Sequence, residues 1–193
     1  MRNREAYSRR WIILLAFVFL ALAVGTWFAL RSGDTVVAPE EIAVKPALAR
    51  TVIGKSVEGR DIEAYTFGHG KTHLLFVGGI HGGYEWNSVL LAYQFIDYFT
   101  DNSKVIPAHL TVTVIPSANP DGVYAVLGKE GRITLADASF ADDTKIGRFN
   151  AHDVDLNRNF DCKWKPESMW KGNVVSAGTL AFSEPEARAI RDF

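Results

Sequence analysis

The sequence predicts an α/β domain, a mixed sheet flanked by helices, that follows one N-terminal transmembrane helix. Three observations predict this: an uncharged segment at 11–30, short β-branched runs at 73–80 and 110–116, and apolar residues at helical spacing between them, at 85–99. Strand, helix and strand in this order are typical of a layered α/β fold. About 150 residues follow the N-terminal segment, which is enough for one domain with a hydrophobic core.

The N-terminal segment predicts a membrane anchor. Residues 11–30 (WIILLAFVFLALAVGTWFAL) carry no charge, and as a helix they would cross a hydrocarbon core of about 30 Å. Residues 1–10 form a basic tail with four arginines and one glutamate, which places them in the cytoplasm and the domain outside it. The alternative is a cleaved signal peptide and a secreted domain, because Ala21-Leu22-Ala23 resembles a cleavage site.

The segment at 31–50 mixes proline, glycine and charges without a period and predicts a linker. The domain is therefore expected at 51–193. Its first part, 51–67, alternates apolar and polar residues on either side of Glu58-Gly59, which predicts an antiparallel hairpin.

Strands and one helix are expected next. The run at 73–80 (HLLFVGGI) predicts a buried central strand. Residues 85–99 predict an amphipathic helix, and 110–116 (LTVTVIP) predict a strand beside the first. The tetrapeptide Asn119-Pro120-Asp121-Gly122 has the composition of a turn.

The remainder predicts a long connection and one helix. Residues 122–154 are polar, with little periodicity, as in a functional lid or an insertion. Ser183 is expected as the N-cap of a helix that runs to Phe193, with Glu186 closing a capping box.

Composition excludes several classes of function. A net charge of -1 gives no electrostatic signature for nucleic acid. With Cys162 as the single cysteine, neither an intramolecular disulfide nor a CxxC site can form. We expect Cys162 to be a small packed residue.

Two polar constellations could carry chemistry. His81 and Glu85 follow a predicted strand among four glycines, and zinc accepts such mixed nitrogen and oxygen ligands. At the carboxyl end of a strand the pair indicates either a metal site or an ordinary polar loop. The second constellation, at 148–160 (RFNAHDVDLNRNF), is either a solvated loop or a polar cluster whose arginines receive an anion.

The chain resembles the zinc carboxypeptidase family in its motifs and in their order. These motifs are HGGYE, then NPDG, then R-x-N with DLNRNF, and last FSEPEARAI. GKSVEGRDIEAYTFG is similar to the opening hairpin of its bacterial members. The resemblance runs from about residue 51 to Phe193 and implies a carboxypeptidase-like fold, of which the chain holds the N-terminal portion.

The resemblance also implies an activity and a set of site residues. His81 and Glu85 match the first two Zn2+ ligands, Arg148 matches the arginine that polarises the scissile carbonyl, and Asn157 and Arg158 match the pair that binds the substrate carboxylate. The implied activity is that of a zinc metallocarboxypeptidase, which hydrolyses a peptide or amide bond next to a carboxylate with a zinc-activated water. The expected substrate is a peptide or muropeptide with a free carboxylate.

The chain departs from the family pattern in two ways. Tyr84 makes the ligand spacing HxxxE in place of the usual HxxE, so either the loop bulges or Glu85 is not the ligand. The third ligand, a histidine, and the general-base glutamate have no counterpart up to Phe193, so both are expected beyond it. His152 matches neither context.

Two other functions stay open. One is a non-enzymatic, membrane-tethered module that binds peptide or cell-wall anions. The other is an acylase of the aspartoacylase or desuccinylase type, which shares DLNR. Asp121-Gly122 after Asn-Pro favours the peptidase over the acylase.

Overall fold

The computed structural model describes residue 27, residues 49–138 and residues 143–193. Almost all of the predicted basic tail, anchor helix and linker, at 1–10, 11–30 and 31–50, lies outside these residues. No helix in the described part of the chain is long and apolar enough to cross a membrane. The chain divides into two units, Met1–Ala43 and Val44–Phe193, and the fold below is that of the second.

The domain is built on a four-stranded mixed sheet with the order β1-β2-β4-β3. Its strands are β1 (Ala49–Lys55), β2 (Asp61–Gly68), β3 (Thr72–Val77) and β4 (Leu110–Ile115). β2 pairs antiparallel with both β1 and β4, and β3 pairs parallel with β4. The predicted hairpin and mixed sheet are therefore confirmed.

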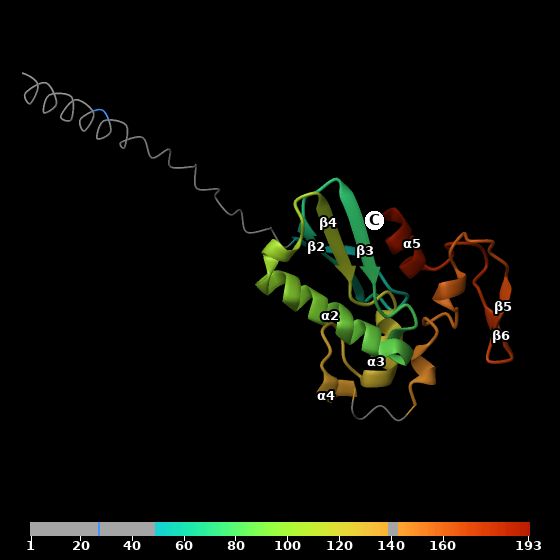
Figure 1. The fold of residues 1–193 in the computed structure, drawn as a ribbon. Coiled ribbons are helices and arrows are strands. Elements are labelled where there is room, and N and C mark those ends of the chain that lie inside the picture. Colours follow the sequence, from blue (N-terminus) through green and yellow to red (C-terminus); the bar gives the residue numbers. More distant parts are fainter. Residues whose placement is uncertain (1–26, 28–48, 139–142) are drawn as a thin grey trace, which may run out of the picture. The chain divides into compact units, whose positions relative to one another are not determined.

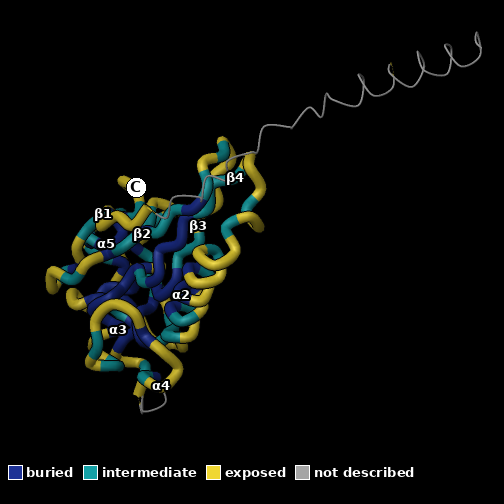
Figure 2. The backbone as a smooth tube through the Cα atoms, turned by 90° about the vertical axis from the view of Figure 1, so that its left-hand side faces the viewer, coloured by how far each residue is buried: buried dark blue, intermediate teal, exposed yellow. Residues whose placement is uncertain are grey.

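Helices cover both faces of this sheet (Figure 1). α2 (Trp86–Asp101) joins β3 to β4 and packs on one face, and α5 (Pro185–Asp192) packs on the other. Successive side chains of β2 point to opposite faces of the sheet, which explains the two layers. Phe67 packs on the face covered by α2, and Ile62 and Ala64 pack with Ala189 of α5. Figure 2 shows the buried residues concentrated between the sheet and the helices.

The apolar run of β3 predicted a central strand. Among the described residues it lies at the edge of the sheet and pairs only with β4. Leu74 and Leu75 are 50% and 47% exposed there. An apolar run shows that both faces of a strand are apolar, and not how many strands flank it, so the central position stays a prediction.

The predicted turn at 119–122 begins a helix, α3 (Pro120–Leu127). Asn119 is its N-cap and accepts a hydrogen bond from the Gly122 N–H at 2.8 Å, and Pro120 occupies the first turn. The prediction was wrong because asparagine and proline favour helix N-termini as strongly as turns. The long connection also contains α4 (Leu135–Ala138).

Short elements complete the domain. The 3-10 helices are η1 (Gly82–Glu85), η2 (Ser103–Val105), η3 (Lys145–Gly147) and η4 (Leu156–Arg158). A separate antiparallel hairpin is formed by β5 (Glu167–Trp170) and β6 (Asn173–Ser176).

Two smaller predictions were also wrong. The capping box does not form, because Glu184 is the N-cap of α5 and the buried carboxylate of Glu186 accepts instead from the Val57 N–H and from Asn150. Cys162 is exposed and is not a packed residue.

Asn119→Ala is expected to lower the free energy of unfolding by about 2 kcal/mol. The Asn119 side chain is fully buried and also donates to the Phe149 carbonyl at 2.9 Å, so the substitution removes the partner of the buried Gly122 N–H and of the half-buried Phe149 carbonyl. Urea unfolding followed by circular dichroism measures the loss. Asn102→Ala, which removes an exposed amide at the end of α2, is the control and should cost under about 0.5 kcal/mol. Equal losses would contradict the N-cap role.

Candidate active site

The structure brings His81 and Glu85 together at the carboxyl end of β3. The buried His81 ring lies with Nδ1 2.7 Å from Glu85 Oε1. The single 3-10 turn of η1 closes the four-residue spacing, and Gly82 supplies a positive φ of 45° at its start. The longer HxxxE spacing is therefore compatible with a paired imidazole and carboxylate.

Glycines let three segments meet backbone to backbone beside this pair. A Cβ on Gly82 would lie 2.6 Å from the Gly147 carbonyl oxygen and 2.7 Å from the Gly122 Cα. β3 and β4 are parallel, so their carboxyl ends place η1 and α3 at the same edge of the sheet. The contact also brings in η3 and positions the next residue, Arg148, near His81.

Asp155 links these residues, and sequence reasoning missed it. The carboxylate is fully buried; Oδ1 lies 3.1 Å from His81 Nε2 and accepts from the Asn157 N–H, while Oδ2 accepts from Arg148 Nη2 at 2.7 Å. Burial opposes ionisation, but hydrogen bonds from His81 and Arg148 outweigh it and hold the pKa of Asp155 below its usual value. The available signal was its place in DLNRNF, two residues before Asn157.

The contact with Asp155 would set the tautomer of His81 in a metal site. Each ring nitrogen of His81 faces a carboxylate oxygen, Nδ1 that of Glu85 and Nε2 that of Asp155. With a metal on Nδ1, the proton would lie on Nε2 and donate to Asp155, which only accepts when ionised. A carboxylate behind a histidine is the usual support of a metal ligand, because it fixes the ring and raises its basicity.

Arg148 is held rigidly beneath an aromatic side chain. It is 4% exposed, and its guanidinium carbon lies 4.5 Å from the centroid of the Trp170 ring, which packs edge-on against Tyr84 and Phe149. Arg148 Nε is buried and has no hydrogen-bond partner in the described part of the chain. The arrangement favours the polar-cluster interpretation of 148–160 over a solvated loop.

Asn157 and Arg158 lie on η4 and line a cavity of about 380 Å³. Asn157 is exposed; Arg158 Nε donates to Ser168 Oγ at 3.0 Å, and its Nη1 donates to the Asn157 carbonyl at 3.3 Å. Lys163 and Lys165 line the same cavity against one acidic residue, Glu167. This excess of cations suits an anionic ligand such as a carboxylate.

The donor set fits part of a catalytic zinc site. An imidazole nitrogen and a carboxylate are typical zinc ligands, and a catalytic zinc takes three protein ligands. The described residues contain no group of three histidine, cysteine, aspartate or glutamate side chains that could hold a metal. His152 does not supply the third ligand, because its Nδ1 lies 2.7 Å from Glu184 Oε2.

A mixed sheet covered on both faces, with a His-Glu pair at the end of a parallel strand, defines an α/β protein whose pair could hold part of a metal site. The family model described as zinc carboxypeptidase matches residues 40–193. The chain belongs to the zinc carboxypeptidase family, as its motifs predicted, and Zn2+ is the metal that this membership implies.

Two curated relatives illustrate the similarity. The chain is 27% identical over 168 residues to gamma-D-glutamyl-L-diamino acid endopeptidase 1 of Lysinibacillus sphaericus, a match that covers 76% of this chain and 42% of the relative. It is 35% identical over 121 residues to carboxypeptidase Z of Rattus norvegicus, which covers 56% of this chain and 17% of the relative. The chain therefore spans less than half the length of these relatives.

Solved structures share the fold. Carboxypeptidase A from Helicoverpa armigera matches with a TM-score of 0.55 and 24% identity, over 76% of this chain and 37% of that one. Bovine thrombin-activatable fibrinolysis inhibitor, in complex with tick carboxypeptidase inhibitor, also has a TM-score of 0.55, with 23% identity over 76% of this chain and 48% of that one. The predicted carboxypeptidase-like fold is confirmed for the described domain.

Proposed function

We propose that the chain supplies the first part of the active site of a zinc metallocarboxypeptidase, which hydrolyses a peptide or amide bond next to a substrate carboxylate. The observation that supports this most directly is the buried carboxylate of Asp155. It contacts His81 and Arg148 and caps the turn that carries Asn157 and Arg158. Three groups with separate tasks in hydrolysis thus depend on one side chain.

Each residue has a chemical task in this proposal. His81 Nδ1 and the Glu85 carboxylate would hold Zn2+, and Asp155 would keep the His81 ring in the required tautomer. Bound zinc supplies a Lewis acid that lowers the pKa of a water molecule towards ~7. Arg148 keeps its charge at every working pH and would stabilise the negative charge that develops on the carbonyl oxygen.

The proposed substrate is a peptide or muropeptide with a free carboxylate. The cavity beside Asn157 and Arg158 is rich in cations, and a planar guanidinium binds a carboxylate through two hydrogen bonds. The relative from Lysinibacillus sphaericus is named for a gamma-D-glutamyl-L-diamino acid bond, which suggests cell-wall peptides as the first substrates to test.

Arg158→Ala is expected to raise KM at least about tenfold for substrates with a free carboxylate, and to change KM for their amides much less. The reason is that the substitution removes a charge that binds the carboxylate and leaves the metal ligands in place. Steady-state kinetics of a protein with a complete domain measures this. Arg191→Ala, which removes an exposed arginine on α5, is the control and should change neither constant. An equal rise in KM for acids and amides would refute the role of Arg158.

A non-enzymatic binding module is the second candidate, favoured by the presence of only two ligands among the described residues. Two ligands should not hold zinc tightly, so the test uses a protein with a complete domain. Stoichiometric zinc with peptide turnover in that protein supports the peptidase, and carboxylate binding without either supports the module.

We also propose that residues 11–30 anchor the domain to a membrane, with the domain on the extracytoplasmic side. This proposal is supported by the uncharged segment and by the four arginines in front of it.

A further inference from the structure

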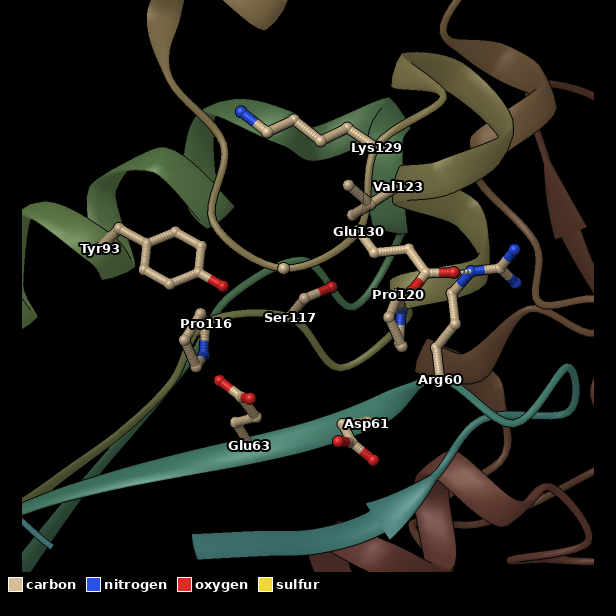
Figure 3. A pocket seen from close by; sticks show the side chains of 11 residues that line it. Arg60, Asp61, Glu63, Tyr93, Pro116, Ser117, Pro120, Val123, Lys129 and Glu130 are labelled. Carbon is tan, nitrogen blue, oxygen red and sulfur yellow. Dashed lines mark ion pairs between the residues drawn. The ribbon is translucent and has the colours of Figure 1, made fainter. Parts of the chain in front are cut away.

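A second cavity, of about 240 Å³, lies between the sheet and the helix layer (Figure 3). Asp61 and Glu63 of β2 line one side of it, and Tyr93 of α2 lines another. Ser117, which follows β4, also lines the cavity. The loop at 129–131 crosses the side opposite β2. None of the candidate active-site residues lines this cavity, so it is separate from the proposed peptidase site.

Two hydroxyl groups lie at this cavity, and one of them is buried without a partner. Tyr93 is 5% exposed, and its hydroxyl points into the cavity (Figure 3). Ser117 Oγ is buried and has no partner in the described part of the chain. Buried hydroxyls are almost always hydrogen-bonded. A polar molecule at the base of the cavity would supply the missing partner of Ser117 Oγ, and the volume of the cavity equals that of about eight waters.

Three carboxylates and two cations line the cavity, and each of them is paired. Arg60 pairs with Asp121 at 2.8 Å and with Glu130 at 3.0 Å, Lys129 pairs with Asp137 at 2.8 Å, and Asp61 pairs with Lys55. The Glu63 side chain is 16% exposed; its Oε1 pairs with Arg50, which is 62% exposed, and its Oε2 accepts from the Tyr65 hydroxyl at 2.7 Å. An ion pair with such an exposed arginine is weak and can be exchanged for another cation.

The shape of the cavity limits the size of the ligand. Val123 and Pro120 of α3, together with Pro116, supply an apolar surface. The volume lies below the usual range for drug-sized ligands. We infer that this cavity binds a small primary amine, with its ammonium group on Glu63, within reach of the Tyr93 and Ser117 hydroxyls, and its alkyl chain against Val123.

The test is an NMR titration of the full 193-residue chain with n-butylammonium chloride, with sodium acetate and glycerol as comparison ligands at equal ionic strength. The expected result is saturable shifts of the Tyr93, Ser117 and Gly131 amide signals with the amine alone. Glu63→Gln should weaken binding at least about tenfold, because it removes a charge-assisted hydrogen bond. Tyr93→Phe, which removes only the hydroxyl, should weaken it about threefold.

Asp101→Asn is the matched control, because it removes an exposed carboxylate at the end of α2, outside the cavity. It should leave the affinity unchanged. The inference is overturned if the amine leaves these signals unmoved, if acetate or glycerol shifts them as far, or if Asp101→Asn weakens binding as much as Glu63→Gln. Because the readout is binding, the result does not depend on peptidase activity.

Discussion

Asp155→Ala is expected to lower the free energy of unfolding by about 3–5 kcal/mol, because it breaks a buried ion pair and leaves one partner behind. The guanidinium of Arg148 would lose its carboxylate while covered by Trp170, and His81 Nε2 would lose its acceptor. Urea unfolding of the chain, followed by tryptophan fluorescence, measures the loss.

Two further variants separate charge from packing at this position. Asp155→Asn keeps the size and one acceptor oxygen, so it should lose less stability than Asp155→Ala. The double variant Arg148→Met/Asp155→Leu removes both charges and should also recover stability.

In a protein with a complete zinc site, Asp155→Asn should lower the zinc affinity by about 10–100-fold, because it removes the charge behind His81. A loss under about 1 kcal/mol for Asp155→Ala would contradict the linking role of Asp155.

Gly122→Ala is expected to cost about 3 kcal/mol, at the upper end for overpacking. Its Cβ would overlap the Gly147 carbonyl oxygen and lie 2.6 Å from Asn119 Nδ2. Neither neighbour can give way easily, because Gly147 itself packs against Gly83 and Asn119 caps α3. The same substitution should move η3, and so displace Arg148. Chemical denaturation measures the first effect, and a crystal structure of the variant shows the second.

Gly128→Ala provides the comparison for Gly122→Ala. Gly128 ends α3 with φ of +62°, and an added Cβ meets nothing within 4 Å. Alanine there should cost only the strain of the left-handed conformation, about 1 kcal/mol. If Gly122→Ala costs no more than Gly128→Ala, close backbone contact is not what holds η1, α3 and η3 together.

Elements with a clear local period could be predicted from the sequence. The β1–β2 hairpin, α2 and β4 follow the expected alternation or helical spacing, because each buries one face. The edge position of β3 and the start of α5 could not be predicted. Strand order depends on partners far along the chain. Glu186 does not close a capping box, because its carboxylate accepts from the backbone N–H of Val57, 129 residues away.

The site residues also divide into those that the sequence could predict and one that it could not. His81 and Glu85 are four residues apart, so their proximity could be expected from the motif alone. Asp155 is 74 residues from His81, and only the folded chain brings its carboxylate to the imidazole. The motif contains Asp155, but its contacts with His81 and Arg148 could be found only from coordinates.

The position of β3 affects how this chain behaves at high concentration. A strand at a sheet edge offers its free backbone groups to any strand that meets it, and apolar side chains strengthen such pairing. Leu74 and Leu75, both half exposed, give β3 few of the charged residues that usually prevent it. Solutions of the 193-residue chain are therefore expected to aggregate through this edge. Leu75→Lys should reduce this aggregation, which light scattering measures.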